Sequence, residues 1–390
     1  MIRDQGRRPA DGGSAPEGFS LSGTVELGGP AAAACQVPGD PAGSFTVLGE
    51  VEVGLDPEGV VVDRNTNRAY VACSRSNSVT VVDIASMSVV DRIEVGREPI
   101  DVEFDDESGL LFTADARSNQ ISVIDVRKGR LVGAVPVGTI PAGLALDRAG
   151  RRLYSGDTMS ASVSVVDVDR LERIASVPAE LGAGAVAVEP RTRRLYCVNF
   201  VTATVTVVDT ESLEVVATIP VGEGPCAVAI RPGTSDVFVV NSLASTVVRI
   251  DGTTNVAVEE FPVPNAPVGL FAGPAGDRLY TANRGDGTVS VLGLDGTEWG
   301  RARVGTAPGG VIVHPEEPGL VLVANAGTGS LSLLEDTLSG PSATEARDSV
   351  HPLVGERVPG FALPDLRTGK VRHQSEWAEK KYILNFFASW

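Results

Sequence analysis

The stretch AVAVEPRTRRLYCVNFVTATVTVVDTESLEVVATIPVGEGP (residues 185–225) contains the pattern that decides the fold. It holds four short, valine-rich runs separated by turn-forming residues such as Pro190 and Gly222. The central aromatic or leucine of this pattern recurs every 42 residues, at Tyr70, Phe112, Tyr154, Tyr196, Phe238, Tyr280 and Leu322. Seven copies of a four-strand unit predict an all-β protein, a seven-bladed β-propeller with four-stranded blades.

The two ends of the repeat array carry complementary parts of one blade. TVLGEVEVG (46–54) matches SVVDRIEVG (88–96), which is the fourth-strand segment of the first copy. The seventh copy ends after three strands, near Glu335. We therefore expect residues 46–53 to form the outer strand of the last blade, so that the ring closes without an unpaired edge.

Two rings of polar residues follow the same period. One stands at the ends of the second strands: Asp115, Asp157, Asn199, Asn241, Asn283 and Asn325, with Cys73 in the first copy. The other ends the third strands: Asp83, Asp125, Asp167, Asp209 and Asp251. Short polar side chains at such positions bond the backbone N–H groups of turns, so we expect both rings to be structural. The recurring tyrosines are expected to be packing residues.

Candidate ligand residues lie where the loops from second to third strand and from fourth strand to the next first strand meet. These loops share one side of a propeller, here called the loop face. Small residues are expected where the innermost strands crowd the axis, and Asp101 is the exception there. It is a candidate anchor for a cation or ligand amine, or else a solvated carboxylate. Cys226 follows Pro225 at the start of the fifth innermost strand. It is either a reactive thiol or a packing residue. Asp115 and Asp157 face the same side and complete the candidate set.

Composition excludes several classes of function. The 390 residues are 43% hydrophobic, with a net charge of −17. That charge disfavours binding to nucleic acid. No apolar run of membrane-spanning length occurs, so no membrane insertion is expected. Four cysteines without a Cys-x-x-Cys pair and three scattered histidines predict neither a metal site nor a cofactor. We expect a monomer.

The repeats resemble the YVTN family of β-propeller repeats. Tyr196-Cys197-Val198-Asn199 and Tyr280-Thr281-Ala282-Asn283 carry that signature, as do the Val-x-Val-Val-Asp strand at 205–209 and the Val-Gly-x-x-Pro turns. The resemblance covers about three quarters of the chain. It implies the propeller fold, and it is weak for function because related propellers serve as binding surfaces, adhesion modules and, less often, enzymes.

The C-terminal residues break the period. Residues 337–353 form a polar linker, and residues 354–390 resemble the start of a redoxin domain of the thioredoxin fold. The matching positions include Gly355, Pro359, Phe361, the Leu363-Pro364-Asp365 run and the final Phe387-Ala388-Ser389-Trp390. In that family the last segment runs into Cys-x-x-Cys, which this chain does not reach. We interpret the chain as a fragment with a flexible leader (1–44), a propeller (45–336), a linker and a partial redoxin.

Two functions follow as hypotheses. The first is a non-catalytic scaffold that presents a protein, peptide or small ligand on the loop face. The alternative is thiol–disulfide oxidoreductase or peroxidase activity in a longer parent protein, carried by the redoxin. A third, weaker hypothesis is a propeller hydrolase or lactonase, which would need a metal cluster. No nucleophile–base pair is apparent, so the enzyme question stays open. The start of the sequence lacks a secretory pattern and favours the cytoplasm, with an extracytoplasmic site as the alternative.

Overall fold

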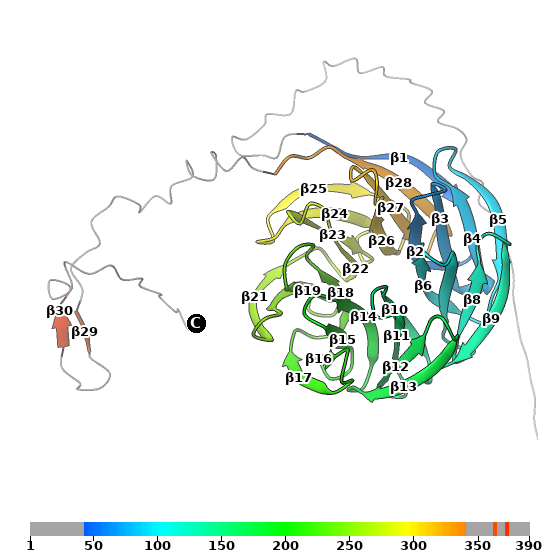
Figure 1. Cartoon of the computed structure of the whole chain (residues 1–390). Coiled ribbons are helices and arrows are strands. Elements are labelled where there is room, and N and C mark those ends of the chain that lie inside the picture. The colour runs from blue at the N-terminus through cyan, green and yellow to red at the C-terminus, as the bar shows by residue number, and fades with distance from the viewer. Residues whose placement is uncertain (1–42, 341–361, 365–370, 374–390) are drawn as a thin grey trace, which may run out of the picture. The chain divides into compact units, whose positions relative to one another are not determined.

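The computed structural model describes residues 43–340, 362–364 and 371–373. Figure 1 shows seven four-stranded antiparallel sheets arranged as blades around a central axis. Within the described residues the one helical element is the single 3₁₀ turn η1 (Ser74–Ser76). The predicted all-β, seven-bladed propeller is therefore confirmed.

Blades 1 to 6 each contain four consecutive strands, with the first strand innermost and the fourth at the rim (Figure 1). Blade 1 contains β2 (Pro57–Asp63), β3 (Arg68–Cys73), β4 (Ser78–Asp83) and β5 (Ser88–Glu94). Blade 2 contains β6 (Pro99–Asp105), β7 (Leu110–Asp115), β8 (Gln120–Asp125) and β9 (Arg130–Pro136). Blade 3 contains β10 (Pro141–Asp147), β11 (Arg152–Asp157), β12 (Ser162–Asp167) and β13 (Glu172–Pro178).

The next three blades repeat this order. Blade 4 contains β14 (Ala183–Glu189), β15 (Arg194–Asn199), β16 (Thr204–Asp209) and β17 (Val215–Pro220). Blade 5 contains β18 (Pro225–Ile230), β19 (Asp236–Asn241), β20 (Thr246–Asp251) and β21 (Val256–Pro262). Blade 6 contains β22 (Pro267–Ala272), β23 (Arg278–Asn283), β24 (Thr288–Gly293) and β25 (Glu298–Arg303).

Blade 7 is built from both ends of the array. It contains β26 (Pro308–Val313), β27 (Leu320–Asn325), β28 (Ser330–Asp336) and, as its outer strand, β1 (Phe45–Glu52). The antiparallel register of β1 and β28 runs from Phe45 opposite Asp336 to Glu52 opposite Ser330. The predicted closure by an N-terminal strand is confirmed.

The hydrophobic core is divided among the blade interfaces. The buried side chains form seven clusters, and each cluster combines residues of two neighbouring blades. Between blades 2 and 3, for example, Phe112 and Ile121 pack with Leu144 and Leu153. The recurring tyrosines are buried in these interfaces, as expected. Each blade therefore shares its buried side chains with both of its neighbours around the ring.

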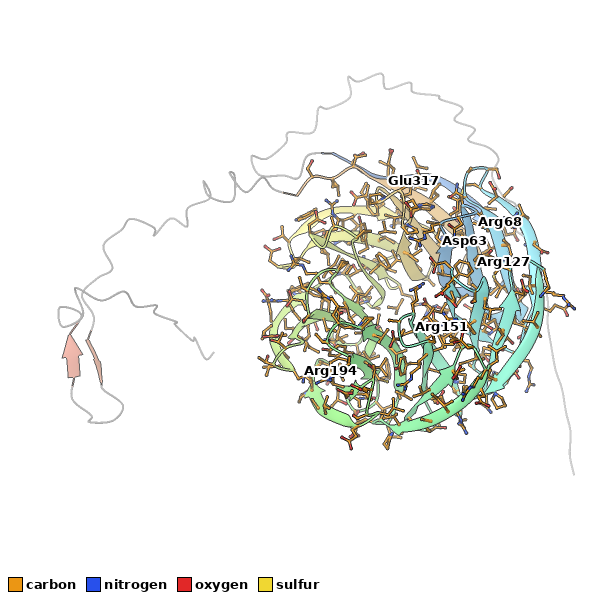
Figure 2. All side chains as sticks on the ribbon, viewed as in Figure 1. Asp63, Arg68, Arg127, Arg151, Arg194 and Glu317 are labelled. Atoms are coloured by element: carbon orange, nitrogen blue, oxygen red, sulfur yellow. The ribbon has the colours of Figure 1, made fainter. Side chains whose placement is uncertain are left out.

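Polar side chains on the side opposite the loop face hold turns and join blades. Asp83 accepts the backbone N–H of Ser86 at 2.9 Å, and the other third-strand aspartates bond their turns in the same way, which confirms that expectation. Arg151, labelled in Figure 2, joins two blades: its guanidinium donates to Asp105 of blade 2 at 2.9 Å and to Asp169 of its own blade at 2.8 Å.

The C-terminal segment is described only at two short strands. β29 (Ala362–Pro364) and β30 (Val371–His373) pair antiparallel, with Ala362 opposite His373. The remainder of the redoxin prediction, and the predicted leader up to residue 42, lie outside the described residues. The thioredoxin-like reading of this tail therefore has no structural support.

Candidate binding site on the loop face

Backbone hydrogen bonds tie together the two kinds of loop that form the loop face. In blade 2 the N–H of Ala116 donates to the carbonyl of Glu98 at 2.9 Å. In blade 5 the N–H of Ser242 donates to the carbonyl of Gly224 at 2.8 Å. These bonds join a second-to-third-strand loop to the loop that enters the same blade. The two kinds of loop on this face are therefore joined to each other by backbone hydrogen bonds within each of these blades.

A cavity of about 460 Å³ opens at the centre of this face. The starts of all seven innermost strands contribute to its lining. Their close approach explains the small residues there. A Cβ on Gly143 would lie 2.6 Å from the Cα of Ala185 in the next blade, and one on Gly269 would lie 2.2 Å from the carbonyl oxygen of Gly309. Small residues let the seven strands meet and leave room for a ligand-sized cavity.

Asp101 lines this cavity and also links two blades. Its Oδ1 accepts the backbone N–H of Val102, and its Oδ2 accepts the N–H of Leu144 in blade 3, both at 2.8 Å. Burial raises the pKa of Asp101 to about 6, while the two N–H donors act in the opposite direction. The structure thus places this predicted residue at the cavity, where its carboxylate has a structural task whether or not it also meets a ligand.

Asp115 and Asp157 lie away from the cavity and are fully buried. Asp115 accepts hydrogen bonds from the hydroxyl of Ser122 at 2.5 Å and from the backbone N–H of Gly96 at 3.2 Å. Asp157 accepts the hydroxyl of Ser164 at 2.6 Å. Burial raises the pKa of both carboxyl groups, and the hydroxyl donors oppose that effect. Both carboxylates have partners inside their own blades, the structural role expected for this ring.

Cys226 lines the cavity as a half-buried thiol. Its Sγ lies 3.5 Å from the carbonyl oxygen of Pro267 and 3.8 Å from that of Val268. Burial raises the pKa of Cys226 to about 12, so the thiol is protonated at neutral pH and a poor nucleophile. Cys73 is fully buried, and its pKa is also raised by burial. Cys35 lies outside the described residues.

One ion pair at the cavity was missed by the sequence argument. Glu58, at the start of blade 1, accepts a hydrogen bond from Arg284 of blade 6 at 2.6 Å. The pair spans blade 7, where Gly309 leaves the space: a Cβ there would lie 2.7 Å from Oε2 of Glu58. Burial raises the pKa of Glu58, and the contact with Arg284 lowers it. The available signal was a charged residue directly after a strand-opening proline, where the other blades have small or apolar residues.

Glu103 lies two residues beyond Asp101 on β6 and is half-buried. Its carboxylate is 3.7 Å from the guanidinium of Arg148. Burial raises the pKa of Glu103 to about 7; Arg148 lowers it, and the negative charges of Asp101 and Asp105 raise it further. At neutral pH this carboxyl group is therefore part-protonated, and its ionised form is disfavoured in the folded state.

We expect Glu103→Gln to be more stable than the wild type at about pH 8 and nearly equal to it at about pH 4. A pKa raised on folding gives stability that is present below the unfolded value and is lost as the pH rises through the folded value. The gain at the higher pH should be on the order of 1–3 kcal/mol. Arg148 retains Asp106 as a partner. Thermal melts across this pH range test the expectation. Glu94→Gln, which removes an exposed carboxylate from β5, is the control for the substitution itself. Equal melting of Glu103→Gln and the wild type at both pH values would contradict the expectation.

Most of the large exposed apolar side chains of the loop face lie on one arc, over blades 3 to 5; Leu55, 64% exposed in the loop that enters blade 1, lies apart from them. Met159, Val201 and Leu243 occupy equivalent positions 42 residues apart in the second-to-third-strand loops, but the sequence pattern alone did not show that their side chains are exposed. Three of the exposed fractions reach about two thirds: 66% for Met159, 66% for Val201 and 67% for Leu243. We call this set the apolar arc; its members are Ile140, Met159, Leu181, Phe200, Val201 and Leu243.

Backbone contacts make much of this arc one continuous surface. The carbonyl of Ile140 accepts the N–H of Thr158 at 2.9 Å, and the carbonyl of Thr158 accepts the N–H of Gly182 at 3.3 Å. The N–H of Val201 then donates to the carbonyl of Leu181 at 3.3 Å. Phe200, a member of the arc, also lines the central cavity. The cavity and the apolar arc are therefore adjoining parts of one site.

The fold and this site define a closed, seven-bladed β-propeller with a central cavity on its loop face. Residues 101–275, somewhat less than half of the chain, match the family model described as YNCE-like beta-propeller. The seven-bladed architecture is the one that the repeats predicted. No curated protein matches the chain. Among solved structures it is similar to hydrazine synthase from Kuenenia stuttgartiensis, with a TM-score of 0.68 and 18% identity over 73% of this chain and 96% of that chain. At that identity the likeness shows the fold alone.

Among residues 43–340, 362–364 and 371–373, no three or more His, Cys, Asp or Glu side chains are grouped so as to hold a metal ion. In the same part of the chain, no helix has the length and apolar character needed to cross a membrane.

Proposed function

We propose that this protein is a non-catalytic binding module that takes its partner on the loop face, across the apolar arc and into the central cavity. The observation that carries the proposal is the position of the apolar arc. Solvent-exposed apolar patches that adjoin a concave site mark binding surfaces in soluble proteins. Here Met159, Val201 and Leu243 are each about two thirds exposed beside such a cavity.

The groups that line the cavity support binding rather than chemistry. Asp101 is engaged by two backbone N–H groups, and Glu58 is engaged by Arg284. Cys226 is protonated at neutral pH because burial raises its pKa to about 12. Each potential acid, base or nucleophile is thus held by the scaffold. The alternative redox function rests on the C-terminal segment, most of which lies outside the described residues, and no described contact favours it.

Selection from a random peptide display library against the full chain tests the proposal. Binding of the selected peptides should fall by at least about tenfold in the triple variant Met159→Ser, Val201→Ser, Leu243→Ser, because a few central apolar residues carry most of an interface's binding energy. All three side chains are exposed, so the fold should be retained, and a thermal melt verifies this.

The control removes three exposed apolar side chains from the rim instead of the loop face. Val90, Val216 and Val258 stand on the outer strands β5, β17 and β21 and are 47%, 44% and 48% exposed. Their triple replacement by serine should leave binding unchanged. Selected peptides that bind the two triple variants equally well would contradict a loop-face site, as would a library that yields no binder.

A further inference from the structure

The charges on the loop face are distributed unevenly around the ring. The loops that border the apolar arc contain Glu180 and Glu223 and no Lys, Arg or His. Both glutamates are exposed, and neither forms an ion pair within residues 43–340. The loops of the other blades carry the basic residues of this face, Arg75, Arg97, Arg117 and Arg284, together with the acidic residues Asp56, Glu98 and Asp286.

The arginines of these other loops are partly neutralised by contacts within the protein. Arg117 pairs with Glu98, and Arg284 pairs with Glu58. The acidic side has no such compensation. Asp101, on the innermost strand β6 of blade 2, adds a carboxylate at the cavity. Its two hydrogen bonds come from neutral backbone groups, one of them in blade 3. The apolar arc is therefore bordered by uncompensated negative charge.

From this charge pattern, and resting on the proposed function, we infer that the partner is a peptide segment of another protein in which apolar side chains are flanked by Lys or Arg. Its apolar side chains would cover Met159, Phe200 and Leu243, and its cationic groups would face Glu180 and Glu223. Complementary charge at the rim selects partners and speeds their encounter, while buried apolar anchors supply most of the affinity. The net charge of −17 acts in the same direction, since it repels acidic segments.

Met159 suits this role because its flexible, polarisable side chain adapts to different apolar partners. It is 66% exposed in the second-to-third-strand loop of blade 3. Phe200 is less exposed, at 42%, and belongs to the apolar arc while also lining the cavity. An apolar residue of the partner can thus enter the cavity mouth, while the residues beside it in sequence remain near the acidic rim.

The composition of the selected peptides is the first test. Those whose binding is lost in the Met159/Val201/Leu243 triple variant should be enriched in Lys and Arg next to apolar residues, relative to the unselected library. Acidic or uncharged peptides that bind this surface equally well would overturn the inference and leave the proposed function standing. If the proposed function is wrong, the selected peptides will instead bind the triple variant as tightly as they bind the wild type.

The second test neutralises the acidic rim. For a selected peptide measured by fluorescence anisotropy, Glu180→Gln with Glu223→Gln should weaken binding by about five- to tenfold at low salt and reduce the salt dependence. The matched control, Glu52→Gln with Glu94→Gln, removes two exposed carboxylates from the outer strands β1 and β5. Equal weakening in both double variants would show that only net charge matters and would overturn the assignment to this rim.

Discussion

Removal of residues 1–53 is expected to abolish the cooperative unfolding transition of the propeller. The deletion takes away β1, which pairs with β28 along its whole length. It also removes Phe45, which packs with Tyr280 at a ring-centroid distance of 6.3 Å, and the fully buried Val53. Blade 7 would keep three strands and expose the edge of β28.

The expected loss is comparable with the whole stability of a domain. Burial of Phe45 and Val53 contributes about 1.5–3 kcal/mol each. Each backbone hydrogen bond of the lost ladder contributes about 0.5–1.5 kcal/mol. Typical domains are stable by about 5–15 kcal/mol in total. We therefore expect the shortened chain to be unfolded or aggregated at about 37 °C.

Circular dichroism melts and differential scanning calorimetry measure this effect. The control removes residues 1–42 only, which leaves β1 and its partners intact and should keep the melting temperature of the full chain. A 54–390 protein that melts at the same temperature as the 43–390 protein would show that the ring does not need its N-terminal strand.

Replacement of Arg278 by methionine is expected to cost about 3–5 kcal/mol, because it leaves a buried carboxylate without its cation. The guanidinium of Arg278 donates to Asp336 at 2.9 Å and to the carbonyl of Leu338 at 2.8 Å. It also lies 5.0 Å from the ring centroid of Trp299. The Asp336 side chain is only 1% exposed and accepts the hydroxyl of Tyr280 at 2.6 Å. Arg278 thus fastens the end of β28 to blade 6.

Chemical denaturation measures this loss, and two controls define its origin. Arg301→Met breaks an exposed pair with Glu298 and should cost no more than about 1 kcal/mol. The double variant Arg278→Met, Asp336→Asn should recover much of the stability, since a neutral group replaces the unpaired charge. If Arg278→Met is no more destabilising than Arg301→Met, the Arg278–Asp336 ion pair does not stabilise the attachment of β28 to blade 6.

Local contacts explain why much of the fold was predictable. The 42-residue period carries the strands, the turns and the caps, because each of these depends on residues a few positions apart. Asp83 and its turn are separated by three residues, and the capping bond was foreseen from that spacing alone. Ring closure was also foreseen, since residues 46–54 repeat the fourth-strand pattern and the seventh copy lacks that strand.

The candidate site was only partly predictable. Asp101 was found because it interrupts a ring of small residues, and it does line the cavity. Asp115 and Asp157 were assigned to the same face, but strand position did not reveal that their carboxylates point to hydroxyls within their own blades. Ser122 and Ser164 stand seven positions beyond Asp115 and Asp157 in the same 42-residue period, so the repeat contained both partners, but their pairing became apparent only when the neighbouring strands were aligned.

The repeat alone was thus sufficient for the propeller, the number of blades and the strand that closes the ring, because period and strand pattern are properties of the chain read in order. The candidate site could be identified only from the tertiary structure. Glu58 and Arg284 are 226 positions apart and meet only because the ring brings blade 1 within reach of blade 6. The apolar arc is assembled from loops of three blades. Met159, Val201 and Leu243 recur at the 42-residue period, but only the folded ring shows that they are exposed and adjoin the cavity. A surface depends on which residues become neighbours after folding, and closure of the ring decides that.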